Sequence, residues 1–205
     1  MNQIILVGYS GHSYVVIESI FENHFQIYGY CDIKKAFNNP YNLNYIGFEG
    51  NDDFMGWKYD FPFFIGIGDN LRRQKIAAFI ETKGKKIATI IDNSSNISNT
   101  AVLDTGTFVC KNVIINSLAK IGKNVILNSG CIIEHECILS DAVHIAPGAV
   151  LSGNVRVGER SFVGANSIIK QGVKIGKDVI IGAGTVVICD VPDGKKIVGN
   201  PGRFI

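Results

Sequence analysis

The sequence predicts an α/β domain in the N-terminal part of the chain and an all-β parallel β-helix in the remainder. Two observations support this prediction. Seventeen of the twenty aromatic residues lie before residue 97, and from Ile97 to Val187 an aliphatic residue stands at every sixth position. Because a change of composition this sharp indicates two domains that build their cores differently, we expect the domains at residues 1–90 and 91–205.

The N-terminal part follows a Rossmann-like βαβ plan, in which a strand runs into a glycine-containing loop and a helix. The expected elements are strands at residues 3–7, 27–31 and 63–67 and helices at residues 14–22 and 71–83. The N–H groups at the start of the first helix can bind an anion. Because Gly8-x-Ser10-Gly11 is only a fragment of the GxGxxG fingerprint, a nucleotide diphosphate on a sugar fits this loop as well as a dinucleotide. His12 can also be an ordinary loop residue.

The remainder of the chain repeats every six residues. Sixteen consecutive positions at this spacing hold Ile, Leu or Val, and from Ala101 to Thr185 a small or medium residue precedes each of them by two. This period is typical of a hexapeptide β-helix, in which three hexads close a triangular coil of about 18 residues. Residues 97–186 therefore predict five coils. Cys131 and Cys137 stand at the small inner positions, which indicates core residues and not nucleophiles.

Residues just before the inward positions are expected to face outward, in columns to which each coil contributes one residue. Two of these columns are apolar. One reads Ile114, Ile132, Val150, Ile168 and Val186, and the other reads Phe108, Ile126, His144, Phe162 and Ile180. Apolar outer columns predict a partner surface and hence a symmetric oligomer. Coverage by the N-terminal domain of the same chain is the alternative.

His135 stands between two carboxylates, Glu134 and Glu136, on a repeat that is otherwise poor in charge. Glu136 can accept the Nδ1 proton of His135 and so raise the basicity of the other ring nitrogen. A general base contributes roughly 10²- to 10⁴-fold to a rate, whereas a surface histidine without a role is the alternative. His135 and His144 are separated by half a coil, which argues against a metal site within one subunit.

Composition excludes several classes of protein. A net charge of +2 over 205 residues gives no electrostatic case for binding nucleic acid. The sequence has no apolar run long enough for a transmembrane helix, so no membrane span is expected, and its first residues do not resemble a secretory signal. Five scattered cysteines without a CxxC motif argue against a disulfide framework or a zinc site and for the reducing cytoplasm.

The whole pattern resembles the hexapeptide-repeat sugar acyltransferases, which include bacterial UDP-4-amino-sugar N-acetyltransferases and sialic-acid O-acetyltransferases. The segments that carry the resemblance are Gly8–His12, Ile67–Asn70, Ile126–Asn128, Ile133–Cys137 and Val198–Gly202. The resemblance implies a left-handed β-helix, a homotrimer, and acetyl-CoA as co-substrate with no metal. The implied reaction is transfer of the acetyl group to the 4-amino group of a UDP-linked deoxysugar, for surface glycan or glycoprotein synthesis.

The resemblance also implies site residues. His135 corresponds to the general base, and Glu136 to the carboxylate that enhances its basicity. The residues implied for the nucleotide sugar are Ser10, Gly11, His12, Asp32, Ile33, Gly68 and Asn128. Those implied for coenzyme A are His144, Gly153, Ala165 and Ala183. At two positions the chain departs from the family pattern: Ile33 replaces a second acid, and Gly202 replaces a common alanine.

Three other functions remain open at this point. The enzyme can be an O-acetyltransferase of sialic acid, or it can acetylate the amine of a GDP-linked sugar. A binding or scaffolding protein without catalytic activity, built on the same helix, is the third. The last of these predicts that removal of the His135 imidazole has no effect.

Overall fold

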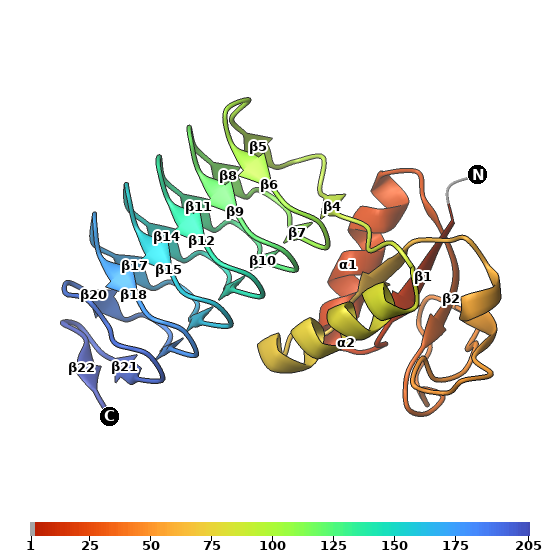
Figure 1. Ribbon diagram of the computed structural model, residues 1–205. Helices are drawn as coiled ribbons and strands as arrows, with labels where there is room; N and C mark the ends of the chain where they lie inside the picture. Colours follow the sequence, from red (N-terminus) through yellow and green to blue (C-terminus); the bar gives the residue numbers. More distant parts are fainter. Residues whose placement is uncertain (1–2) are drawn as a thin grey trace.

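The computed structural model describes residues 3–205. The N-terminal part contains a three-stranded parallel sheet in the order β2-β1-β3. Its elements are β1 (Gln3–Val7), α1 (Gly11–Glu22), β2 (Gln26–Cys31), a 3-10 helix η1 (Met55–Lys58), β3 (Phe63–Ile65) and α2 (Asn70–Thr82) (Figure 1). The βαβ order predicted from the sequence is confirmed, and β1 lies at the centre, with the loops after β1, β2 and β3 at one edge.

Helix α1 begins three residues earlier than the sequence analysis expected. The cause is local hydrogen bonding, because the Ser13 hydroxyl accepts from the Ser10 N–H at 2.7 Å and donates to the Ser10 carbonyl at 2.6 Å. His12 is consequently a residue of the first helical turn and not of a loop. Helix α2 is capped by Asp69, whose carboxylate accepts the Arg72 N–H at 2.7 Å.

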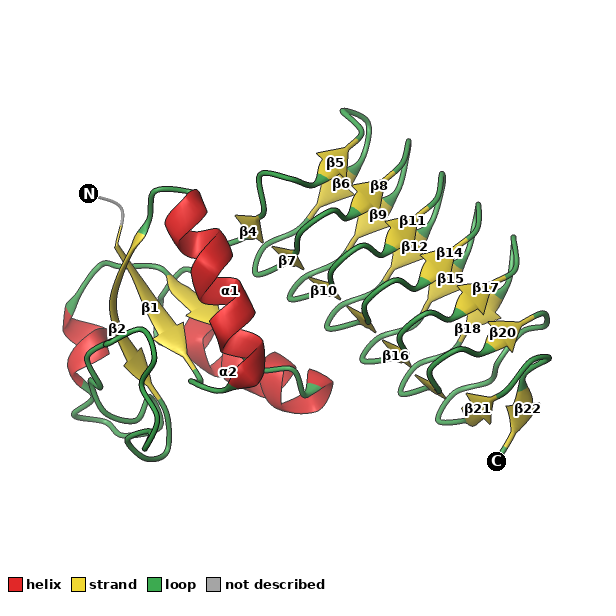
Figure 2. Cartoon of the chain, turned by 180° about the vertical axis from the view of Figure 1, so that it is seen from behind, coloured by secondary structure: helices red, strands yellow, loops and turns green. Residues whose placement is uncertain are grey.

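The remainder of the chain is a parallel β-helix with three faces (Figure 2). The first face is formed by β4 (Ile90–Ile91), β7 (Phe108–Val109), β10 (Ile126–Leu127), β13 (His144–Ile145), β16 (Phe162–Val163), β19 (Ile180–Ile181), β21 (Lys196–Val198) and β22 (Arg203–Phe204). The second is formed by β5 (Asn96–Ile97), β8 (Ile114–Ile115), β11 (Ile132–Ile133), β14 (Val150–Leu151), β17 (Ile168–Ile169) and β20 (Val186–Val187). The third is formed by β6 (Val102–Leu103), β9 (Lys120–Ile121), β12 (Ile138–Leu139), β15 (Arg156–Val157) and β18 (Lys174–Ile175).

The coil length predicted from the sequence is confirmed by the strand register. Ile126 pairs with His144 and Ile132 with Val150, so each strand pairs with the strand three hexads later in the chain. The helix extends beyond the expected residues 97–186, because β4 adds one hexad before them. After β20 the spacing shortens, and Ile180 pairs with Lys196 instead of with a residue one full coil later.

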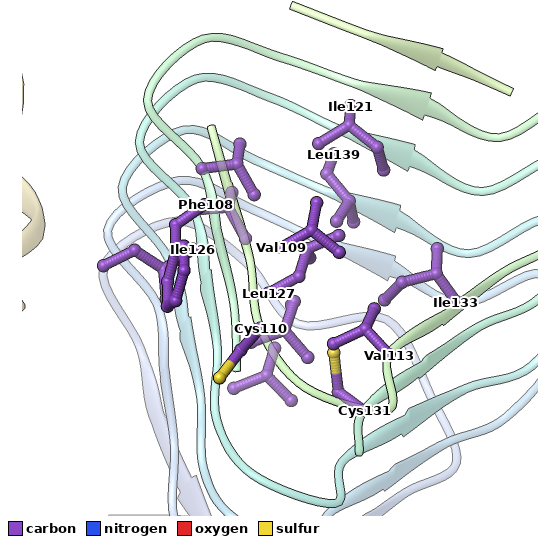
Figure 3. Packing of buried hydrophobic residues seen from close by; sticks show 14 of the residues in the cluster. Phe108, Val109, Cys110, Val113, Ile121, Ile126, Leu127, Cys131, Ile133 and Leu139 are labelled. Carbon is purple, nitrogen blue, oxygen red and sulfur yellow. The ribbon is translucent and has the colours of Figure 1, made fainter. Parts of the chain in front are cut away.

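The inside of the β-helix is packed with the predicted aliphatic residues (Figure 3). Fourteen of the sixteen positions from Ile97 to Val187 lie in the core cluster. The other two, Ile97 and Leu103 of the first coil, are partly exposed and pack against it. Cys131 and Cys137 are buried among them, as expected. Burial raises the pKa of the Cys137 thiol to about 11, so this thiol is protonated at neutral pH and is no nucleophile.

The three corners of each coil share one backbone feature. Residues with φ between 54° and 76° recur at each corner, once in every coil. Most are Asn or Gly, which tolerate the left-handed conformation. At one corner the four successive residues are Leu118, Glu136, Asn154 and Gly172.

The α/β part lies against the first face of the β-helix. Phe108 and Ile126 are only 1% exposed there, and the Phe64 and Phe108 rings are 6.1 Å apart. We expected both apolar columns to face a partner. For Phe108 and Ile126 of the first face this expectation was wrong, because the α/β part of the same chain covers them. The column of the second face stays open, with Ile168 47% exposed.

The buried guanidinium of Arg73 joins the two parts of the chain. Its Nε donates to the Asn124 carbonyl at 2.8 Å, and its Nη2 donates to the Ala142 carbonyl at 2.9 Å. Both acceptors belong to the β-helix. Nη1 donates to the carbonyls of Ile67 at 3.2 Å and Gly68 at 3.1 Å. Burial lowers the pKa of Arg73 to about 9, and the side chain still carries its charge at neutral pH.

No helix within residues 3–205 is long and apolar enough to cross a membrane.

We predict that Arg73→Ala lowers the free energy of unfolding by about 3 kcal/mol or more. The substitution leaves buried carbonyls of both parts without donors, and each unpaired group costs about 1–3 kcal/mol. Arg72→Ala on the same helix is the matched control, because its ion pair with Asp32 is long (3.9 Å) and solvent-exposed. Urea unfolding followed by circular dichroism measures both variants, and equal effects would contradict the role given to Arg73.

Candidate active site

His135 lies at the corner between β11 and β12, where the second face of the β-helix meets the third. Its Nδ1 is 3.1 Å from Oε2 of Glu136, and both side chains are at least half exposed. A carboxylate can only accept a hydrogen bond, so Nδ1 carries the proton and the lone pair of Nε2 is free. The arrangement can take up a proton at Nε2 and stabilise the resulting imidazolium.

The His135 ring rests on the backbone of the next coil. A side-chain carbon at Gly153, the residue one coil further on, would collide with the ring atoms Cε1 and Nε2. The sequence analysis expected Gly153 to contact coenzyme A. The structure adds that the absence of a side chain at Gly153 leaves room for the imidazole.

A pair of histidines lies at the junction, the place where α1 meets the first face. The rings of His12 and His144 are 6.1 Å apart, and Asn128 Nδ2 is 3.4 Å from His144 Nε2. Burial, together with the nearby positive charge of Arg73, lowers the pKa of His12 to about 4 and that of His144 to about 3. Both imidazoles are therefore neutral at pH 7 and act as hydrogen-bonding groups, not as cations.

One nitrogen of this pair has no partner. Nε2 of His12 is buried and makes no hydrogen bond within the described residues. Because an unpaired buried polar group is costly, this atom favours a ligand at the junction. His12, Asn128 and His144, which the sequence assigned to substrate or coenzyme A, are thus brought together in one cluster.

The remaining residues expected to bind the nucleotide sugar meet at the edge of the sheet where β1, β2 and β3 end. Asp32 accepts the Tyr9 N–H at 3.2 Å and the Ile33 N–H at 2.8 Å, so it orders the loops after β1 and β2. Ser10 and Gly11 start α1 at the same edge, and Gly68 follows β3. The side chain of Ile33 is 64% exposed and makes no polar contact. This edge is where open α/β sheets bind ligands.

Small residues form a line along the corner between the first and second faces. Its members are Ser129, Pro147, Ala165 and Ala183, and we call it the small-residue trough. The coils are closely spaced beside it, since a side-chain carbon at Gly164 would lie 2.6 Å from the Ala183 nitrogen.

Within one chain, His135 with its neighbours Glu136 and Gly153 is separated from the histidine pair and from the sheet edge. The α/β part lies against the first face (Figure 2), whereas His135 projects from the corner opposite that face. Among residues 3–205, no hydrogen bond links His135 to the histidine pair or to the sheet edge.

Sequence reasoning missed Arg73, which lies beneath the junction and lowers the pKa of both histidines. A signal was present, because Arg73, Ala77 and Ile80 are spaced as one face of α2 and all three are buried. A charged residue on an otherwise buried helix face points to a specific internal partner.

The described residues contain no group of three or more His, Cys, Asp or Glu side chains arranged to hold a metal ion.

Comparison with known proteins identifies relatives for both parts of the chain. The family model of the PglD N-terminal domain matches residues 3–80, and that of the hexapeptide repeat of succinyl-transferase matches residues 154–189. A mutant of perosamine N-acetyltransferase from Caulobacter crescentus, solved in complex with CoA and GDP-perosamine, is 31% identical. That match has a TM-score of 0.94 and covers 99% of this chain and 96% of the other.

Two further structures share this fold over nearly the whole chain. The acetyltransferase domain of PglB from Neisseria gonorrhoeae, solved with acetyl coenzyme A, is 28% identical, with a TM-score of 0.93 and coverage of 100% and 99%. WeeI from Acinetobacter baumannii AYE is 24% identical, with a TM-score of 0.87 and coverage of 98% and 99%, and supports the fold alone.

These matches confirm the predicted fold class, a Rossmann-like domain followed by a left-handed β-helix. They also confirm coenzyme A as the expected co-substrate carrier. The identity of 31% extends along almost the full length of both chains. The chain therefore belongs to the hexapeptide-repeat sugar acyltransferase family and is a coenzyme A-dependent sugar N-acetyltransferase.

Proposed function

We propose that the enzyme transfers the acetyl group of acetyl-CoA to the 4-amino group of a nucleotide-linked deoxysugar, with His135 as the general base. The observation that carries this proposal is the 3.1 Å contact between His135 Nδ1 and Glu136, which leaves Nε2 free at an exposed corner. The product is an acetylated, activated sugar, which suits a glycosyltransferase that builds a surface glycan or glycoprotein.

The proposed reaction is direct transfer without an acyl-enzyme. The amine nitrogen attacks the thioester carbonyl, and Nε2 of His135 takes the proton that is released as the C–N bond forms. Glu136 stabilises the imidazolium. The C–S bond then breaks, and the proton on His135 passes to the departing thiolate of coenzyme A. Neither Cys131 nor Cys137 takes part, because both are buried.

We assign the coenzyme A arm to the small-residue trough and the nucleotide sugar to the sheet edge. His144 and Gly153 together with Ala165 and Ala183 remain our candidates for coenzyme A. For the nucleotide sugar, the unpaired His12 nitrogen and the loops around Ser10, Asp32 and Gly68 offer hydrogen-bond donors and acceptors. The sequence favours UDP with GDP as the alternative, and a relative that is 31% identical was solved with GDP-perosamine.

We also propose that the active enzyme is a homotrimer. The apolar column of the second face is open to solvent, with Ile114 37% and Ile168 47% exposed. His135 projects away from the nucleotide-sugar loops of its own chain, so an adjacent copy has to bring a sugar to it. Symmetric assembly through the second face meets both requirements.

We expect His135→Asn to lower kcat by roughly 10²-fold or more, because the variant loses the proton acceptor. The assay mixes the enzyme, acetyl-CoA and a panel of UDP-, GDP- and CMP-linked sugars, and follows release of free thiol and the mass of the product. Mass spectrometry of the product also separates acetylation of an amine from that of a hydroxyl.

His24→Asn is the matched control for this variant. His24 is exposed, lies in the turn after α1, and has a φ of 59°, which Asn tolerates. It should keep the wild-type rate. An unchanged rate in His135→Asn would remove His135 from the mechanism.

We expect Ile168→Lys to dissociate the homotrimer, because it places a charge in an apolar contact between copies. Val102→Lys is the control, since Val102 is 61% exposed on the third face, where the outward column also holds Lys120 and Lys174. Light scattering gives the mass of each variant. An Ile168→Lys protein with the wild-type trimeric mass would refute the assignment of the second face.

A further inference from the structure

A cavity of about 340 Å³ opens at the sheet edge beside the proposed nucleotide-sugar loops. Its apolar walls come from Ile33, Phe48 and Ile76, and Arg72 and Lys75 of α2 also line it. The volume lies within the roughly 300–1,000 Å³ typical of small-molecule sites. Asp69, the cap of α2, lines the cavity as well. Apolar walls with two cations among the lining residues suit a planar heterocycle that carries a phosphate chain.

One acidic side chain in this cavity is unusual. Glu49 is only 4% exposed, and its Oε2 has no hydrogen-bond partner among the described residues. Burial raises the pKa of Glu49, and the nearby charge of Asp32 raises it further. Hydrogen bonds from the Glu49 backbone N–H and the Cys31 thiol, together with the charge of Arg72, act in the opposite direction and favour the ionised form. A buried carboxylate oxygen without a donor is costly unless a ligand supplies one.

The missing partner is a hydrogen-bond donor, because an ionised carboxylate only accepts. Among nucleobases, guanine offers two adjacent donors on one edge, N1–H and the 2-amino group. Uracil offers a single N–H between two carbonyl oxygens, and these oxygens would be brought close to the negative charge. The chemistry of Glu49 therefore discriminates between these two bases.

We propose that this cavity holds the base of the sugar nucleotide and that Glu49 selects guanine over uracil. This inference rests on the proposed function, which supplies the sugar nucleotide. It deepens that function by choosing GDP over UDP, the two nucleotides left open above. Arg72 and Lys75 line the same cavity and are the cations available to the diphosphate. Glu49 is a specificity residue and not a catalytic one, because it is remote from the His135 corner.

The test is calorimetric binding of GDP and UDP, without acetyl-CoA, to the wild-type enzyme and to Glu49→Gln. The wild type should bind GDP at least about tenfold more tightly than UDP. In Glu49→Gln, the affinity for GDP should fall about 10- to 100-fold, because one acceptor becomes a donor that opposes the donors of guanine. The affinity for UDP should hold or rise, because an amide matches the N–H and carbonyl of uracil.

Glu81→Gln is the matched control, an exposed carboxylate on α2 outside the cavity, and it should leave both affinities unchanged. Equal or tighter binding of UDP by the wild type would overturn the proposal. So would an unchanged GDP affinity in a folded Glu49→Gln protein. If this variant does not fold, the comparison of GDP with UDP on the wild type still tests whether the cavity prefers guanine over uracil.

The acetylation assay separates this inference from the proposed function. Acetylation of a UDP-linked sugar alone would overturn the role of Glu49 and leave the proposed function standing. Preferential GDP binding that depends on Glu49, with no acetylation of any nucleotide sugar, would overturn the proposed function and support the base assignment.

Discussion

The length of one coil governs the rest of the structure. Three hexads return the chain to the same face, so each inward position lies on the inward position of the previous coil. The same spacing places Gly153 beneath His135, which frees the space that the imidazole occupies. It also places Glu136 at a corner where φ is 61°, in a column that continues with Asn154 and Gly172. The acid that orients the base thus stands where the backbone favours Asn or Gly.

The junction between the two parts combines packing with control of charge. Arg73 satisfies carbonyls of both parts, and its buried charge also helps to keep His12 and His144 neutral. A neutral histidine can donate through one nitrogen and accept through the other, which suits polar contacts with an anionic substrate and its amide-containing co-substrate. His135, at the exposed corner, has a different environment. The three histidines therefore have different chemistry because of their surroundings.

The β-helix could be predicted from the sequence because the pattern that encodes it is local and repeated. An aliphatic residue every six positions determines which side chains face inward, and the contact between His135 and Glu136 follows from their adjacency. The junction could not be predicted in this way, since the bonds of Arg73 join residues that are far apart in the chain, as with Asn124 and Ala142. For the same reason, the sequence did not predict that the α/β part covers Phe108 or that Glu49 is buried. Glu49 lies in an irregular segment without periodicity, and its burial depends on how that segment pairs with the end of β2 around Tyr30 and Asp32.

One experiment tests most directly whether the coil positions the pair His135 and Glu136. It compares the thermal unfolding of Glu136→Asn with that of Leu118→Asn and measures the rate of acetyl transfer by both variants. Both residues occupy the same left-handed corner, with φ of 61° and 64°. Relief of the backbone strain is worth about 1 kcal/mol, or roughly 2–4 °C in Tm for a chain of this length. Both variants should be more stable, and only Glu136→Asn should be slower. A Glu136→Asn protein that unfolds at a lower temperature than the wild type, or that keeps the full rate, would contradict this view of the corner.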